Sequence, residues 1–374
     1  MTITAKPIRH AVRLNSGARQ GALAVHGQAD DLKPQSNSRE NAMTDQMTRW
    51  ERVRAALAGA ELDRPPVSMW RHFFAQENSA SELAGAMLGF QRQYDWDFMK
   101  VNPRASYHDE DWGVDARFSD SNTVDPEIVD WPVKSPDDWD AIQPLDVGQG
   151  VLGEHLEALR LISDGLDGEV PFLMTIFTPL SIAGRLTESE DAMTEHLRMS
   201  PEKVHRVLDV VTDTYTRFAR ECLSIGADGI FFATTRWGSY DRLTDDEYAE
   251  FGRPYDLRLL EALPEAEFNL LHVCGSNNML SKLADYPVSA FNWDTQDETN
   301  VWLDEGEKLT GKAAIGGVSH RGALIGGSPD EVAGEAARAA AAMGGSHWML
   351  GLGCTYSHEA PEANLRSLSP AFMR

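Results

Sequence analysis

Short apolar runs alternate with longer amphipathic stretches along most of the chain. Several runs are apolar at nearly every position, as expected for parallel strands covered on both faces. The predicted strands lie at residues 66–70, 97–102, 171–178, 229–234, 268–274, 288–294, 313–319 and 347–354. Helices are predicted at residues 201–225, 245–263, 277–284, 301–309 and 329–343. The alternation predicts an α/β fold, a (β/α)8 TIM barrel, with an open doubly wound sheet as the second candidate.

The first part of the chain lacks this pattern. Residues 1–43 show no sustained apolar periodicity and no apolar core of a secretory signal, so we expect a disordered tail or an over-extended gene start. Thr48 and Glu51 have the spacing of a capping box, which predicts a helix over residues 50–59. One barrel domain is therefore predicted over residues 44–374, with a hairpin and loop insertion around residues 107–144.

Composition excludes several classes of protein. The 374 residues include 34 Lys and Arg against 58 Asp and Glu, a net charge of −24 that would repel nucleic-acid phosphates. No apolar run reaches the roughly 18 residues of a membrane span. The 3 cysteines are too few for a disulfide framework and fit a reducing compartment, so a cytoplasmic location is expected. The oligomeric state is left open, a homodimer included.

Candidate metal ligands gather at the ends of two predicted strands. His272 and Cys274 are two positions apart and therefore share one face of a strand, while Cys354 ends the last predicted strand. The carboxyl ends of barrel strands open onto one face. One imidazole and two thiolates suit Zn²⁺ and leave a fourth position for a substrate. We predict a zinc site here; the alternative is that both cysteines, like Cys222, are small core residues.

Residues 50–368 resemble the uroporphyrinogen decarboxylase superfamily. The matching pieces are the segments 51–53, 63–67, 247–254, 272–275 and 316–318, and Cys354 followed by the segment 361–364. This resemblance implies a (β/α)8 barrel and two branches of function. In the zinc methyltransferase branch, which serves corrinoid proteins and resembles cobalamin-independent methionine synthase, a His-x-Cys motif is followed much later by a cysteine.

His272, Cys274 and Cys354 reproduce that signature of the methyltransferase branch. The resemblance further implies that Asp294 fills the fourth zinc position, although Asp294 is equally a candidate cap for the loop that follows it. The implied reaction is activation of a small-molecule thiol for methyl transfer from a corrinoid partner, which would carry methylcobalamin, or from another methyl donor.

The decarboxylase branch implies the alternative, a carboxy-lyase that acts without a cofactor on a porphyrinogen or a smaller acid. Arg71 matches one arginine of that branch, but Ala75 stands where a second arginine would be, and residues 101–104 hold no carboxylate where the branch has a catalytic one. We therefore predict a zinc-dependent methyltransferase. A third alternative is a barrel that binds a corrinoid or tetrapyrrole without turnover.

Other polar residues at the ends of predicted strands are candidates for contact with the substrate. Those for binding an anionic or polar group are Arg71, Lys100, Arg104, Arg236 and Tyr240, and those for proton transfer are His320 and His358.

Overall fold

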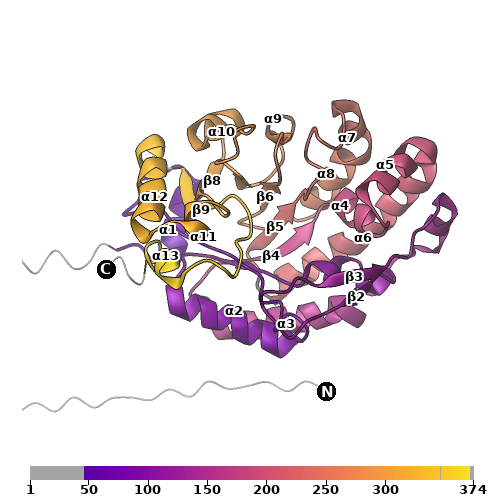
Figure 1. Cartoon of the computed structure of the whole chain (residues 1–374), viewed down its shortest axis with the longest axis horizontal. Helices are drawn as coiled ribbons and strands as arrows, with labels where there is room; N and C mark the ends of the chain where they lie inside the picture. The colour runs from indigo at the N-terminus through magenta and orange to yellow at the C-terminus, as the bar shows by residue number, and fades with distance from the viewer. Residues whose placement is uncertain (1–45, 346, 371–374) are drawn as a thin grey trace, which may run out of the picture. The chain divides into compact units, whose positions relative to one another are not determined.

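A computed structural model of the chain describes residues 46–345 and 347–370, and the tail predicted at residues 1–43 lies outside them. Seven parallel strands form one curled sheet in the order β1-β4-β5-β6-β7-β8-β9 (Figure 1). They are β1 (Met99–Val101), β4 (Phe172–Phe177), β5 (Gly229–Ala233), β6 (Leu270–Val273), β7 (Ala290–Trp293), β8 (Ala313–Val318) and β9 (Trp348–Leu352). Nearly every strand residue is buried, which explains the continuous apolar runs in the sequence.

The first predicted strand, at residues 66–70, is not a regular strand. Val67 forms one parallel bridge with Leu350 of β9, and its carbonyl accepts a hydrogen bond from Asp97 N–H at 2.8 Å. Pro66 has no N–H to donate to a ladder. The parallel α/β sheet is confirmed, but the described residues form seven strands and this bridge rather than a full eight-stranded barrel.

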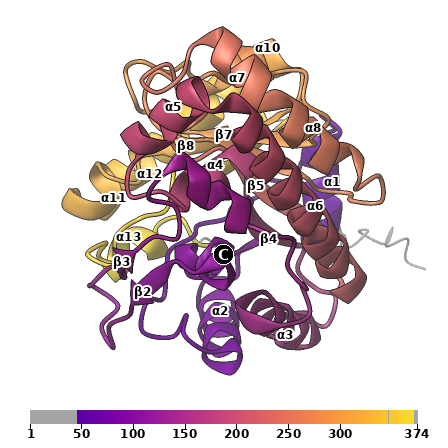
Figure 2. The same ribbon diagram turned by 90° about the vertical axis from the view of Figure 1, so that its right-hand side faces the viewer.

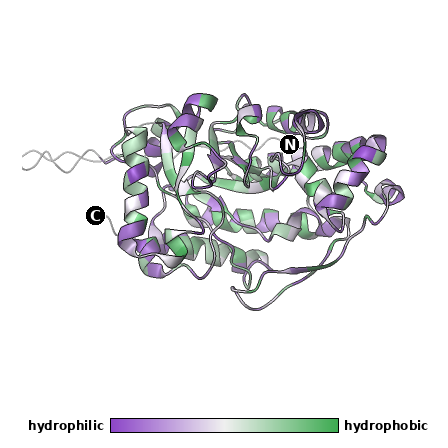
Figure 3. Cartoon of the chain, turned by 45° about the horizontal axis from the view of Figure 1, so that its top comes forward, coloured by the Kyte–Doolittle hydropathy of each residue, from purple (hydrophilic) through white to green (hydrophobic). Residues whose placement is uncertain are grey.

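Helices lie on the outside of the sheet, and Figure 3 shows mixed hydrophobic and hydrophilic positions along them. Their bounds are α1 (Arg49–Leu57), α2 (Ala80–Tyr94), α3 (Gly150–Leu166), α4 (Pro179–Arg185), α5 (Glu190–Met199), α6 (Pro201–Ile225), α7 (Asp245–Phe251), α8 (Arg253–Glu261), α9 (Leu280–Leu283), α10 (Leu303–Thr310), α11 (Ala323–Gly326), α12 (Pro329–Met343) and α13 (Glu362–Arg366). The helix predicted at residues 245–263 is two helices, α7 and α8, which meet at Gly252. No helix among the described residues is long and apolar enough to cross a bilayer.

Local sequence signals set the ends of several helices. The capping box of Thr48 and Glu51 is present at the start of α1, as predicted. Helices α6 and α12 occupy the ranges predicted for them: each begins with a proline, whose missing N–H costs nothing at that position, and is followed by a glycine. Cys222 is fully buried on α6 and belongs to the core.

Between β1 and α3 the chain forms a small separate sheet. Strands β2 (Asp115–Arg117) and β3 (Glu127–Asp130) pair antiparallel, apart from the main sheet (Figure 2). Three 3₁₀ helices accompany them: η1 (Ala105–His108), η2 (Glu110–Trp112) and η3 (Pro136–Ala141). The loop between β2 and β3 forms part of a pocket wall described below.

A buried ion cluster ties the beginning of the fold to the sheet. The carboxylate of Asp97 is fully buried and contacts Arg52 Nη1 at 2.7 Å and Arg64 Nη1 at 2.5 Å. It also accepts the N–H of Val67 at 2.8 Å. Because a buried charge needs such partners, Asp97 holds α1 and the bridge segment against the edge of β1.

Candidate functional site

The three residues predicted as zinc ligands come together at the carboxyl ends of two strands. The ligand atoms of His272, Cys274 and Cys354 lie within 4.8 Å of one another. His272 is on β6 with Cys274 just beyond its end, and Cys354 lies shortly after β9. Since β7 and β8 separate these strands in the sheet, the curl of the sheet brings Cys354 back to the other two.

Asn292 on β7 fixes the ring of His272. The Asn292 side-chain amide donates to the carbonyls of Ile315 and Leu352, both at 2.8 Å, so its Oδ1 is left as an acceptor. His272 Nδ1 lies 2.6 Å from this oxygen and must therefore carry the proton. The lone pair is then on Nε2, on the side of Cys354, as a metal-binding imidazole requires. Asn292 was not among the residues predicted from the sequence, although the parallel register places it directly beside His272.

The two thiols of the cluster are not equivalent. Their mutual hydrogen bond raises the pKa of Cys274 and lowers the pKa of Cys354 well below its ordinary value. The neighbouring His272 lowers the pKa of Cys354 further, against the effect of burial. One imidazole nitrogen and two sulfurs, one of which is biased toward thiolate, form a donor set that fits Zn²⁺.

Asp294 does not join this cluster. Among the described residues, the group whose ligand atoms lie within 4.8 Å of one another contains His272, Cys274 and Cys354 but not Asp294. Its Oδ1 accepts the N–H of Gln296 at 3.1 Å, and its Oδ2 lies 3.6 Å from Nδ1 of the buried His320. The carboxylate therefore caps the following loop, the alternative left open by the sequence, and we leave it out of the ligand set. His320 lies beside the cluster, and burial lowers its pKa.

A cavity of about 340 Å³ opens in front of the three ligands. Its walls include aromatic and polar side chains besides the ligands, namely Trp70, Phe177, Phe231, His72, Lys100, His108, Thr175 and Arg236. Lys100 is buried there with Nζ 4.6 Å from the Phe231 ring, whose centroid is 5.2 Å from that of His272. Burial lowers the pKa of Lys100 to about 7, so this amine titrates near neutrality within the cavity.

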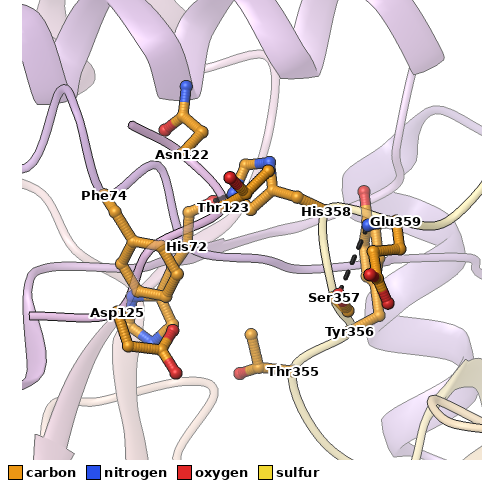
Figure 4. A pocket seen from close by; sticks show the side chains of 10 residues that line it. All are labelled: His72, Phe74, Asn122, Thr123, Asp125, Thr355, Tyr356, Ser357, His358 and Glu359. Atoms are coloured by element: carbon orange, nitrogen blue, oxygen red, sulfur yellow. Dashed lines mark hydrogen bonds between the residues drawn. The ribbon is translucent and has the colours of Figure 1, made fainter. Parts of the chain in front are cut away.

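A second pocket, of about 450 Å³, lies outside the cavity; we call it the outer pocket (Figure 4). It is lined by His72, Phe74, Asn122, Thr123, Asp125, Thr355, Tyr356, Ser357, His358 and Glu359. His72 and Thr355 also line the cavity, so they form the wall that the two spaces share. His358 lies in the outer pocket and not in the cavity, with Nε2 donating to the carbonyl of His72 at 2.6 Å.

Arg104 is not available to a substrate, contrary to our expectation. It is buried, and its guanidinium contacts Glu110 at 2.7 Å and Glu154 at 2.8 Å. It also donates to the carbonyl of Glu77 at 2.8 Å. With these acceptors in place, Arg104 is a structural cation, and it does not line the cavity.

The other predicted substrate contacts are divided. Arg236 lines the cavity, and its side chain is 70% exposed, 3.4 Å from Glu190. Arg71 packs over the ring of Phe73 at 4.9 Å and lies outside the cavity wall. Tyr240 is likewise absent from the wall; it is 46% exposed on the outer surface. Position after a strand did not determine which of these side chains turn inward.

Replacing Asn292 by alanine is expected to weaken zinc binding about 10–100-fold, the usual cost of losing a group that orients a metal ligand. Competition with a chromophoric chelator measures this affinity. Asn364→Ala is the matched control, since Asn364 is also buried and donates to three carbonyls, away from the cluster. Equal zinc affinities in wild type and Asn292→Ala would contradict the assignment.

Comparisons with known proteins identify a family for the chain. The family model of uroporphyrinogen decarboxylase (URO-D) matches residues 48–373. The methylcobamide:CoM methyltransferase MtbA of Methanosarcina acetivorans is 26% identical over 245 residues, which cover 65% of this chain and 70% of the relative. The uroporphyrinogen decarboxylase of Syntrophotalea carbinolica is 29% identical over 176 residues, covering 45% of this chain and 50% of the relative.

A solved structure, a methyltransferase from Methanosarcina mazei, superposes with a TM-score of 0.75 at 20% identity. The match covers 86% of this chain and 97% of that structure. At this level of identity the likeness establishes a shared fold.

Proposed function

Because the chain belongs to the uroporphyrinogen decarboxylase family, we propose that it is a zinc-dependent methyltransferase. It would activate a thiol for transfer of a methyl group from a corrinoid partner or another donor. The observation that carries the proposal is the convergence of His272, Cys274 and Cys354, with Nδ1 of His272 held by Asn292. The relatives named methylcobamide:CoM methyltransferase support the same reaction class.

His272, Cys274 and Cys354 would hold the zinc ion. When bound by such ligands, Zn²⁺ lowers the pKa of a thiol in its open position, so that the thiol reacts as thiolate. Asn292 keeps the imidazole in the required tautomer. The rings of Trp70, Phe177 and Phe231 give the cavity apolar walls, which exclude water and orient the two reactants.

The carboxy-lyase alternative has weaker support in the cavity. None of the described residues that line it is an aspartate or glutamate, and Arg104 is paired with its own carboxylates. The similarity to uroporphyrinogen decarboxylases therefore agrees with the family and the fold, while the cysteines and the histidine favour methyl transfer.

Metal analysis and a transfer assay on one preparation test the proposal. We expect one zinc ion per chain and S-methylation of 2-mercaptoethanol by methylcobalamin. The change in cobalamin absorbance measures the rate of this reaction. Cys222→Ser is the control, because Cys222 is buried on α6 outside the ligand cluster, and it is expected to retain both zinc and activity.

Folded protein that takes up no zinc would contradict the proposal. So would decarboxylation of a porphyrinogen that continues after complete chelation, and cobalamin binding without turnover would favour the binding-module alternative.

A further inference from the structure

His72 occupies the wall between the cavity and the outer pocket. It lines both spaces, and its ring stacks on Phe74 at a centroid distance of 5.1 Å. In Figure 4, His72 and Phe74 lie on one side of the outer pocket and the loop from Tyr356 to Glu359 lies on the other. His72 therefore has access to a molecule in the cavity and to the space outside it.

The ring of His72 is oriented by a buried carboxylate. Its Nδ1 lies 2.9 Å from Oε1 of Glu77, and that oxygen also accepts the N–H of Phe73 at 2.6 Å. Because an ionised carboxylate only accepts hydrogen bonds, the proton is on Nδ1 and the lone pair is on Nε2. No hydrogen bond to this Nε2 is found among the described residues.

Glu77 is buried beside this ring. The residue is only 1% exposed, and within the described part of the chain its Oε2 is buried without a hydrogen-bond partner. The pair therefore has the arrangement of a proton acceptor with an orienting group.

The other basic groups of the cavity are less suited to this role. His108 donates from Nδ1 to the carbonyl of Ala105 and accepts the N–H of Phe177 at Nε2, both at 2.9 Å. His272 is a proposed metal ligand. Lys100 lies over an aromatic ring and does not border the outer pocket. Among the described residues, His72 is thus the imidazole of the cavity wall that has a free nitrogen outside the ligand set.

We propose that His72 accepts the proton of the thiol that enters the cavity, with Glu77 as its positioning residue. This inference rests on the proposed function. The S–H bond breaks, its electron pair stays on sulfur, and the proton forms a new bond to Nε2 of His72. The carboxylate of Glu77 balances the imidazolium, which can release the proton through the outer pocket.

Several other charged or titratable groups contact His72 or line the two spaces that it borders. They are Glu77 from its own segment, Asp125 from the loop between β2 and β3, His358 and Glu359 after β9, and Lys100, Arg236 and the two ligand cysteines from the cavity wall.

The test compares pH profiles of methyl transfer from methylcobalamin to 2-mercaptoethanol in the zinc-loaded full chain. In wild type the rate should fall toward acid pH, because a protonated ring accepts no proton. His72→Gln should lower the rate about 100-fold at neutral pH and abolish this acid limb. Glu77→Gln should lower the rate by less than His72→Gln does, because the base remains but loses the group that orients it.

A second readout does not depend on activity. In zinc-free full chain with isotopically labelled histidine, NMR should show the His72 proton on Nδ1, and Glu77→Gln should weaken this preference for one tautomer. The matched control is His205→Gln, which alters another His–Glu pair, 3.3 Å apart, on the outside of α6. It should change neither the pH profile nor the tautomer of His72.

An acid limb that survives in His72→Gln, or that disappears in Lys100→Met instead, would overturn the inference while leaving the proposed function intact. A ring proton on Nε2 in the zinc-free protein would overturn it as well. Absence of zinc binding or methyl transfer in wild type would contradict the proposed function itself, and this inference with it.

Discussion

Replacing Cys354 by serine is expected to remove zinc from the protein and to lower the rate of methyl transfer by more than about 100-fold. Loss of a residue that only orients a metal ligand costs up to about 100-fold, and loss of a ligand itself should cost more. A serine hydroxyl does not ionise near neutral pH, whereas its neighbours lower the pKa of the Cys354 thiol. The same change also takes the thiolate acceptor at position 354 away from Cys274.

Zinc content by atomic spectroscopy and the cobalamin assay check this expectation together. Cys222→Ser provides the cysteine-to-serine control outside the cluster. If Cys354→Ser retains a full complement of tightly bound zinc, Cys354 is no ligand and the methyltransferase proposal loses its basis.

Replacing Asp97 by alanine is expected to destabilise the protein by about 3–5 kcal/mol, the usual cost of removing one partner from a buried ion pair. The change leaves the nearly buried guanidinium of Arg52 with one carboxylate partner, Asp63, instead of two. It also leaves the N–H of Val67 without an acceptor. Unfolding in urea, followed by circular dichroism, measures the free energy of unfolding.

Glu127→Ala is the matched control for Asp97→Ala. Glu127 pairs with Arg117 at 3.3 Å, but both side chains are exposed, so its loss should cost less than about 1 kcal/mol. Similar destabilisation by both substitutions would show that burial of Asp97 contributes nothing.

Most strands of the sheet could be predicted from the sequence, because parallel strands that are buried on both faces consist of continuous apolar runs. The segment at residues 66–70 has such a run but starts at a proline, and its single bridge reflects the lost donor. Helices α2 and α3 were not predicted. Their glycines weaken the helical signal, and Gly165 of α3 packs closely against Leu88 of α2, whose Cδ1 would lie 2.3 Å from a Cβ there.

The ligand cluster was predictable because same-face spacing and strand ends are properties of the sequence. Its surroundings depend on contacts between distant segments. Arg104 looked available because nothing nearby in the chain shows that Glu154 pairs with it. Asp294 directly follows β7, close to the predicted strand end. Its backbone packs against Gly353, where a Cβ would lie 2.7 Å from the Asp294 Cα. The carboxylate of Asp294 turns to the following loop.

The placement of Cys354 after the last strand bears on how the protein matures. During synthesis, β6 leaves the ribosome with His272 and Cys274 while β7, β8 and β9 are still to be made. Two of the three metal ligands are then present without the third, and the metal site stays incomplete until β9 has paired with β8. Loading of the ion would therefore be a late event, after translation of the strand region, and a nascent chain would hold metal only weakly.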